Sequence, residues 1–257
     1  MKKFFGPVGV VFVVILKFFA KLKFIVLPVL KFLPIFLKTG GTMFISVWAY
    51  AMFWGWWFAL GFVLLIFVHE CGHLLVAKRL GLKVGAPVFI PFMGAIIALK
   101  EAPKNAWIES QVGIGGPVLG TLGAGICEII YLMTDNLMFR GLANIGFFLN
   151  LFNLAPVGFL DGGRVATALS PWLWIVGFTI LVAMAIAHPN FLLILILVMS
   201  LPRLFSLFRH RSEAEQRYYE VTPAQRWTMA IMYFGLIAIL VLGMSMTDIP
   251  REALAVQ

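Results

Sequence analysis

The sequence predicts an all-α polytopic membrane protein with about six transmembrane helices and a re-entrant, β-like loop. Hydrophobic residues make up 62% of the 257 residues, charged residues only 12%, and the mean hydropathy is +1.00. A soluble domain is typically about 45–50% apolar and about 25% charged, so a soluble enzyme, a disordered chain and a fibrous protein are not expected. No polar stretch is long enough to form a separate soluble domain, so we expect the membrane bundle to carry the function.

The first part of the chain is apolar but repeatedly interrupted by lysine. Residues 4–16 and 24–37 are short apolar runs bordered by lysine, which predicts basic amphipathic helices in the membrane interface or one tilted entry helix. Residues 41–54 are apolar and aromatic, and residues 56–80 predict a long membrane-spanning helix. Because no small-residue cleavage site follows the first run, we expect the N-terminal segment to be retained.

Residues 84–99 differ in kind from the helical segments. Prolines, glycines and β-branched residues within this apolar stretch argue against a straight helix. An apolar segment that is not helical must be shielded by protein or face a water-filled cavity, so we expect a re-entrant loop or hairpin. Gly94 within it would allow another backbone to approach closely.

The second half of the chain alternates apolar spans with polar connections. Residues 100–111 are polar, and residues 203–226 form the main basic loop. The positive-inside rule places this loop and the lysine-rich N-terminus in the cytoplasm. Small residues at positions 113, 116, 120 and 124 predict close helix packing. The expected spans cover residues 112–133, 138–157, 172–187, 190–201 and 227–246.

The net charge of +9 indicates contact with the membrane surface rather than with nucleic acid. The basic residues flank apolar runs, so the expected partner is the lipid bilayer with its anionic headgroups. The two cysteines, Cys71 and Cys127, are too few for a disulfide framework and lie in apolar surroundings, so we expect reduced packing residues.

The sequence His69-Glu70-Cys71-Gly72-His73 is an H-E-x-x-H motif on the predicted helix 56–80. Residues four apart lie on one helix face, so His69 and His73 can share one tetrahedral zinc ion. Glu70 projects beside them and is placed to take a proton from water. Charged and imidazole groups are costly in hydrocarbon, which favours a functional site over two core histidines and a chance glutamate.

A zinc site of this kind needs a third protein ligand and an open position. Asp161 is the best candidate, because it follows a helix end and a proline and stands before Gly162 and Gly163. An unpaired aspartate there would be neutralised by desolvation, whereas a divalent metal keeps it ionised. The other candidates lie within a span, in turns or in the basic loop; they are Glu128, Asp135, His188 and His210.

The H-E-x-x-H motif, paired with N-x-x-P-x-x-x-x-D-G-G at residues 153–163, resembles the site-2 protease family of intramembrane zinc metalloproteases. The resemblance covers roughly residues 55–170. The chain departs from better-known members of that family, because we expect a compact member with no room for a PDZ insertion and with no CBS domain. The resemblance implies that His69, His73 and Asp161 bind Zn²⁺ and that Glu70 is the general base. It also implies that Asn153 contacts the substrate or the tetrahedral oxyanion, to which its amide can donate a hydrogen bond.

The activity implied by the resemblance is hydrolysis of peptide bonds within or near transmembrane segments of membrane proteins, as in regulated intramembrane proteolysis. The expected setting is a prokaryotic plasma membrane. Segment 84–99, with Gly94, is expected to offer a strand edge to an extended substrate. The expected organisation is an N-terminal membrane-associated segment at 1–40, the protease core at 41–202, and the cytoplasmic loop with the last span at 203–257.

Other functions are compatible with parts of the sequence. A prenyl-protein type protease also carries H-E-x-x-H, but its third ligand is a glutamate on a following helix. A non-proteolytic metal-binding protein or transporter usually needs more metal-binding side chains than one compact cluster. A pseudo-protease that only binds transmembrane segments is disfavoured by the intact Glu70.

Overall fold

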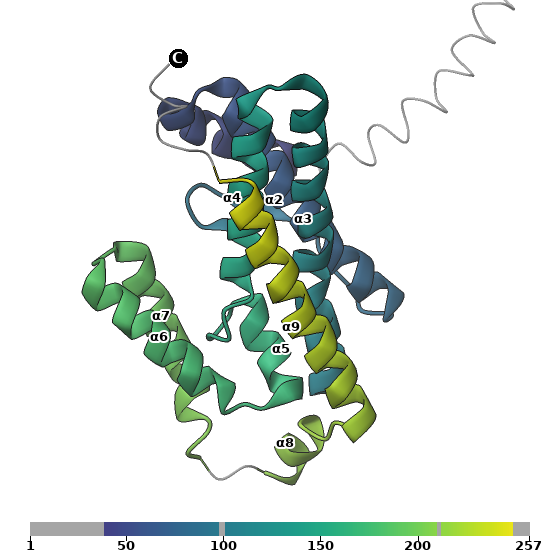
Figure 1. Ribbon diagram of the computed structural model, residues 1–257. Coiled ribbons are helices and arrows are strands. Elements are labelled where there is room, and N and C mark those ends of the chain that lie inside the picture. Colours follow the sequence, from purple (N-terminus) through teal and green to yellow (C-terminus); the bar gives the residue numbers. More distant parts are fainter. Residues whose placement is uncertain (1–38, 98–100, 210–211, 249–257) are drawn as a thin grey trace, which may run out of the picture.

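Helices dominate the computed structural model, which describes residues 39–97, 101–209 and 212–248 (Figure 1). The elements in chain order are a helix over residues 39–54, α2 (Trp56–Arg79), β1 (Val88–Ile90), β2 (Gly94–Ile96), α3 (Ala106–Thr134), α4 (Leu137–Asn153), α5 (Asp161–Leu169), α6 (Leu173–Ala187), α7 (Phe191–Phe205), α8 (Glu213–Tyr218) and α9 (Pro223–Met246). The apolar runs expected at 4–16 and 24–37 lie outside the described residues.

Three helices in the described ranges are long and apolar enough to cross a membrane, namely α2, α3 and α9. Helices α6 and α7 are apolar but have only 15 residues each, and α4 has 17. The expected class, a mostly helical membrane protein, is therefore confirmed at the level of helices and apolar length. The expected spans at 56–80, 112–133 and 227–246 coincide with the three long helices.

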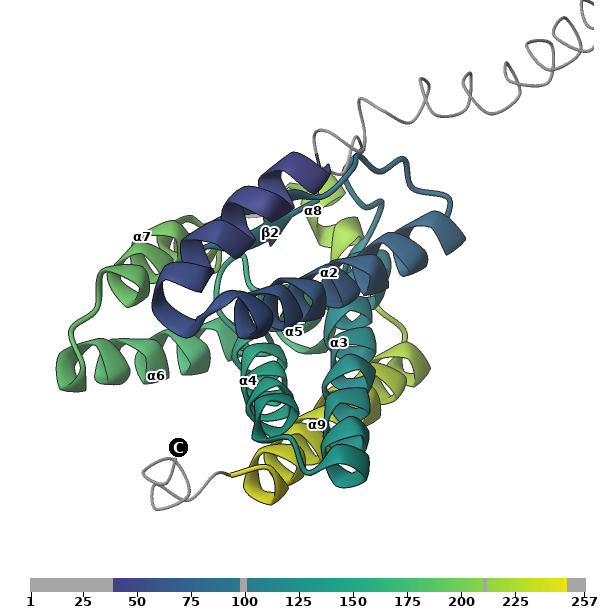
Figure 2. The same cartoon turned by 90° about the horizontal axis from the view of Figure 1, so that it is seen from above.

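Helix α3 lies at the centre of the bundle. It packs against α2, α4 and α5, and α9 lies against α3, α4 and α5. Seen from above, α3 lies between α2 and α9 (Figure 2). The buried core between these helices includes Ala143 and Phe147 of α4 with Tyr233 and Leu240 of α9. The α3 helix therefore connects the H-E-x-x-H helix to the rest of the bundle.

Helices α6 and α7 form an apolar hairpin that stands to one side of the bundle in Figures 1 and 2. Leu181 of α6 and Ile196 of α7 join a buried cluster with Val157 and Leu160, which precede α5. The hairpin therefore packs on the chain segment that leads into Asp161.

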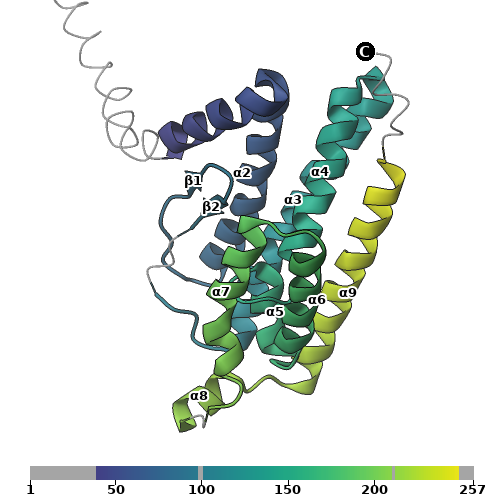
Figure 3. The same ribbon diagram turned by 90° about the vertical axis from the view of Figure 1, so that its left-hand side faces the viewer.

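The segment expected to be a re-entrant loop contains an antiparallel hairpin of β1 and β2 (Figure 3). Ile90 pairs with Gly94, whose φ of 91° lies in the region that favours glycine. The hairpin is held from outside, because Phe89 N–H donates to Thr42 Oγ1 (3.1 Å) and Phe92 N–H donates to the Tyr50 hydroxyl (2.9 Å). The segment therefore contains β-structure, as the sequence predicts, and this hairpin lies beside α2.

Two expectations about the polar segments are wrong. Segment 100–111 is not a connection throughout, because α3 begins at Ala106 and Asn105 Oδ1 caps it by accepting from Ile108 N–H (2.9 Å). Segment 203–226 is not one loop, because it contains the end of α7, the whole of α8 and the start of α9. Ser212 with Glu215 and Thr222 with Gln225 form capping boxes, so polar residues begin these helices rather than interrupt them.

Candidate metal centre

The H-E-x-x-H residues lie inside α2, ahead of its basic end at Lys78 and Arg79. His69, Glu70 and His73 are 3%, 8% and 7% exposed. Asp161 begins α5 and is 7% exposed. Helix α2 and the N-terminus of α5, which are far apart in sequence, therefore bring four polar side chains together in the buried interior of the bundle.

The three expected ligands converge on one point. The Nε2 atoms of His69 and His73 are 3.1 Å apart, and Asp161 Oδ2 lies 3.1 Å from the first and 3.2 Å from the second. Donor atoms on a tetrahedral zinc ion with bonds of about 2.0–2.1 Å are about 3.3 Å from one another. The triangle of donor atoms therefore has the size of one face of a zinc tetrahedron.

The outer nitrogens of both imidazoles are held by hydrogen bonds. His69 Nδ1 donates to Asn150 Oδ1 (2.7 Å), whose amide group in turn donates to Gly146 O (2.7 Å). His73 Nδ1 donates to Val112 O (2.7 Å). Such partners fix the tautomer and ring orientation of metal-binding histidines. The Val112 carbonyl can only accept, and its 2.7 Å contact is shorter than the 3.3 Å approach of the Gly116 N–H to the same nitrogen, so we assign the proton of each ring to Nδ1, which leaves a lone pair on each Nε2.

The chemistry of this donor set fits a cation. Two imidazole lone pairs and a carboxylate oxygen approach one another without a proton between them, which is electrostatically unfavourable unless a positive ion lies among them. Nitrogen and carboxylate ligands in a tetrahedral arrangement suit Zn²⁺. His69, His73 and Asp161 also form a group that can hold a metal ion in the described residues.

Glycines on α3 make room for this arrangement. A Cβ on Gly116 would lie 2.7 Å from His69 Nε2 and closer still to the His73 ring. A Cβ on Gly120 would collide with the Asn150 side chain. The small residues expected at a packing face therefore lie directly against the imidazoles and their anchoring amide, where any side chain would displace them.

Glu70 lies next to the ligands in sequence but has a different environment. The structure shows no hydrogen bond of its carboxylate with any residue in the described ranges, although the side chain is 8% exposed and the charges of Asp161 and Arg164 act on it. A buried carboxylate without a structural partner is available to exchange a proton with a bound water or substrate.

The structure separates the remaining candidates from this centre. His188 caps the C-terminus of α6 and is exposed at the α6–α7 turn, and Asp135 is exposed in the α3–α4 turn. Glu128 lies along α3 with its Oε2 buried and unpartnered among the described residues. His210 lies outside the described residues.

Asn153 and Gly94 lie on two further elements. Asn153 is the last residue of α4, partly exposed, and its side chain makes no hydrogen bond within the described part of the chain. Gly94 begins β2, and a Cβ there would meet nothing within 4 Å.

Sequence reasoning missed the role of Asn150. By polarity alone the amides of Asn144, Asn150 and Asn153 would suit a water path, but the Asn150 side chain is 2% exposed and anchors His69. Asn144 instead donates to Met244 O (3.2 Å) and Thr247 Oγ1 (3.1 Å), and so joins α4 to the end of α9. The only sequence signal for Asn150 is an amide in the middle of an apolar span.

A family match covers the part of the chain that contains the H-E-x-x-H residues. The family model for peptidase family M50 matches residues 57–137, a range that contains His69, Glu70 and His73 but neither Asn153 nor Asp161. This match confirms the resemblance to the site-2 protease family.

Several curated proteins resemble the chain over part of its length. A zinc metalloprotease of Methanocaldococcus jannaschii is 30% identical over 131 residues, which are 49% of this chain and 37% of that protein. The probable zinc metalloprotease EGY2, chloroplastic, of Arabidopsis thaliana is 26% identical over 152 residues, 42% of this chain and 27% of that protein. Rip3 of Mycobacterium tuberculosis is 30% identical over 117 residues, 42% of this chain and 29% of that protein.

The matched segments span less than two fifths of the length of each of these relatives. The names of the first two agree with zinc as the expected cofactor, as does the group formed by His69, His73 and Asp161.

Proposed function

We propose that this chain, whose residues 57–137 match peptidase family M50, is an intramembrane zinc metalloprotease that hydrolyses peptide bonds within or near transmembrane segments. The observation that carries the proposal is the convergence of His69 Nε2, His73 Nε2 and Asp161 Oδ2 beside an unpartnered Glu70. Two of the three converging side chains, and Glu70, belong to α2, which is long and apolar enough to cross a membrane.

His69, His73 and Asp161 would hold the zinc ion. When bound, zinc supplies Lewis acidity that makes water a better nucleophile and polarises a peptide carbonyl. Asn150 and the Val112 carbonyl hold the imidazoles in the tautomer that this role requires.

Glu70 is the general base and acid. It accepts the proton of the attacking water and then gives that proton to the leaving amine. In this proposal Asn153 donates a hydrogen bond to the oxyanion or the substrate, because its amide is not engaged within the described part of the chain.

The β1–β2 hairpin is the proposed binding edge for an unwound substrate. Phe89 N–H points away from β2 to Thr42, so its cross-strand partner Ala95 directs its own N–H and C=O away from β1. The outer edge of β2 can therefore pair with an extended peptide by strand addition. Gly94 begins this edge and lets the substrate backbone approach closely.

The proposed substrates are membrane proteins with a single transmembrane segment, in keeping with regulated intramembrane proteolysis. The proposed location is a prokaryotic plasma membrane, with the N-terminus and residues 203–226 in the cytoplasm. Residues 1–40 are then a membrane-associated segment, 41–202 the protease core, and 203–257 the basic region with the last span.

The test is cleavage of a co-expressed panel of single-pass membrane proteins by the natural chain and by Glu70→Gln, with zinc content measured for both. We expect about one zinc per chain in both proteins and cleavage by the natural chain only. Cleavage by Glu70→Gln at an undiminished rate would refute the general-base role. Failure of both proteins to retain zinc would refute the ligand assignment.

A further inference from the structure

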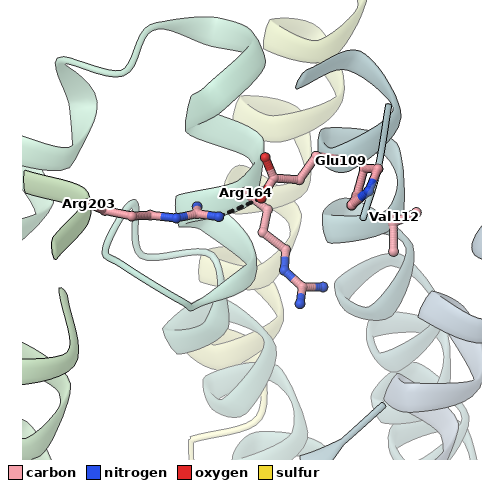
Figure 4. Close-up of a pocket in the computed structure, with 5 residues that line it drawn as sticks. Glu109, Val112, Arg164 and Arg203 are labelled. Atoms are coloured by element: carbon pink, nitrogen blue, oxygen red, sulfur yellow. Dashed lines mark hydrogen bonds and ion pairs between the residues drawn. The ribbon is translucent and has the colours of Figure 1, made fainter. Parts of the chain in front are cut away.

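A small cavity lies directly behind the candidate metal centre. It has a volume of about 130 Å³ and is lined by Pro103, Glu109, Val112, Arg164 and Arg203 (Figure 4). Val112 also accepts the hydrogen bond of His73 Nδ1, so one residue separates the cavity from a proposed zinc ligand. Arg164 lies on α5 one turn after Asp161.

The cavity has more positive than negative charge in its lining. Both oxygens of Glu109 are engaged, one by Arg203 Nη2 (2.5 Å) and the other by the Tyr218 hydroxyl (2.8 Å). Burial, together with the neighbouring Glu109 carboxylate, raises the pKa of Tyr218, so its hydroxyl remains a donor at neutral pH. The single negative charge of Glu109 therefore balances the charge of Arg203, which leaves the charge of Arg164 unbalanced within the lining.

Two groups of the lining have no hydrogen-bond partner in the described ranges. Arg164 forms no hydrogen bond or close ion pair there, although its positive charge acts on the Glu70 carboxylate, and Figure 4 shows its guanidinium turned away from Glu109 and Arg203. Arg203 Nη1 is buried without a hydrogen-bond partner. Unpaired guanidinium donors in a partly buried cavity are best satisfied by a planar anion that accepts two hydrogen bonds.

We infer that this cavity is a carboxylate-binding subsite for the substrate or product peptide, with Arg164 as its main contact; this rests on the proposed protease function. A carboxylate with accompanying water fits the volume, since one water occupies about 30 Å³ of liquid. The carboxylate is either an acidic side chain near the scissile bond or the new C-terminus that hydrolysis creates. Peptides with lysine or arginine at that position are rejected by like charge.

The subsite gives the enzyme a selection rule. Cytoplasmic flanks of transmembrane segments are enriched in lysine and arginine. The cavity is lined by arginine and lies at the end of the bundle where the basic residues 203–226 are found. Its positive charge disfavours binding of these lysine- and arginine-rich flanks. It favours the minority of membrane segments that carry an acid close to the cleavage position.

The experiment measures binding without turnover, in the full-length chain carrying Glu70→Gln and purified in detergent. Two matched pairs of short, apolar, fluorescent synthetic peptides are used. One pair differs by an internal glutamate or glutamine, and the other by a C-terminal acid or amide. Dissociation constants are measured for this background and after adding Arg164→Gln, Arg164→Lys or Arg226→Gln. Arg226 is an exposed arginine outside the cavity, so it is the matched control for lost charge.

We expect the acid member of at least one pair to bind about tenfold more tightly than its neutral partner. The pair that shows the difference identifies the source of the carboxylate. Arg164→Gln should abolish the preference, Arg164→Lys should restore part of it, and Arg226→Gln should leave it unchanged.

Equal binding within both pairs overturns the subsite, and so does an equal loss of preference in Arg226→Gln and Arg164→Gln. The melting temperature shows whether Arg164→Gln folds. If it does not fold, the difference in dissociation constant between acid and neutral peptides on the Glu70→Gln protein still tests whether the chain prefers a carboxylate. Zinc content and cleavage by the natural chain are recorded separately. A protein that cleaves without any acid preference refutes only the subsite, and one that shows the preference but never cleaves refutes only the protease.

Discussion

At the scale of single residues, the candidate centre depends on groups that never touch the expected metal. Asn150 fixes the ring of His69, and its own orientation is fixed because Nδ2 donates to Gly146 O (2.7 Å). The Val112 carbonyl does the same for His73. The orientation of the two imidazole rings is therefore determined by α3 and α4, which both pack against α2.

Replacing Asn150 with alanine should weaken zinc binding about 10- to 100-fold, because His69 loses the acceptor that fixes its tautomer. Zinc affinity can be measured by competition with a chromogenic chelator. Asn144→Ala is the matched control, since that amide bonds to Met244 and Thr247 instead. Equal affinities in Asn150→Ala and the natural chain would show that the hydrogen bond does not position the ligand.

The grouping of His69, His73 and Asp161 was predictable from sequence, but the residues that anchor the two imidazoles were not. The spacing of His69 and His73 on one helix, and the Asp161 turn, can be recognised within short windows. Asn150 lies 81 positions from His69, and nothing in the local pattern indicates that the two side chains meet. An amide within an apolar span signals only that some polar partner exists.

At the scale of elements, α3 is the helix that tolerates the least change. Gly116 faces the two imidazoles and Gly120 faces Asn150, whereas a Cβ on Gly125 of the same helix would meet nothing within 4 Å. The same helix thus contains glycines at which a Cβ would clash and a glycine at which it would not, so the effect of a glycine-to-alanine substitution can be compared between the two kinds of position.

Gly116→Ala should abolish or severely weaken zinc binding, because the added methyl would lie 2.7 Å from His69 Nε2. Gly125→Ala, the control, should keep zinc and gain up to about 1 kcal/mol in stability through helix propensity. Zinc content and thermal unfolding in detergent measure both effects. Full zinc occupancy in Gly116→Ala would contradict the packing described for α3.

Ala95→Pro should lower kcat/KM at least about tenfold while zinc content stays unchanged, because proline removes the N–H at the outer edge of β2. Ala95→Val keeps the N–H and should retain most of the activity. If the proline variant cleaves as fast as the valine variant, the substrate does not pair with this edge.

The boundaries of the elements were predictable to different degrees. Apolar length located the long helices, and the prolines and glycines of residues 84–99 indicated the non-helical segment. Helix α8 was missed because it has only six residues, of which four are charged or amide side chains, and because its capping box follows Arg209 and Arg211 in a strongly polar stretch. The start of α3 was missed because its first turn carries Glu109, whose partners come from distant helices.

At the scale of the whole molecule, Glu109 connects α3 to α7 and α8. Its partners Arg203 and Tyr218 lie 94 and 109 positions away in sequence, so no local pattern reveals this contact. Arg140 makes a comparable link at the other end of the bundle, since it donates to the Tyr131 hydroxyl and to Met246 O. The helices are therefore joined by polar contacts at both ends of the bundle.

The proposed orientation predicts that a cysteine at Glu213, which is exposed in α8, is protected from a membrane-impermeant thiol reagent in intact cells. A cysteine at the exposed Thr134, at the opposite end of α3, should be labelled from outside. Labelling is compared with that of the natural chain, whose cysteines are only partly exposed. Labelling of position 213 and not 134 in intact cells would show the reverse orientation.

The α6–α7 hairpin also bears on the lipid around the protein. Helices of 15 residues extend about 22 Å, whereas the hydrocarbon layer of a bilayer is about 30 Å thick. Where this hairpin meets lipid, acyl chains must compress to match it, at a modest cost for each ångström of mismatch. A long apolar helix arriving beside α6 and α7 would enter a locally thinned bilayer, where its ends lie closer to water and its own fit to the membrane is poorer.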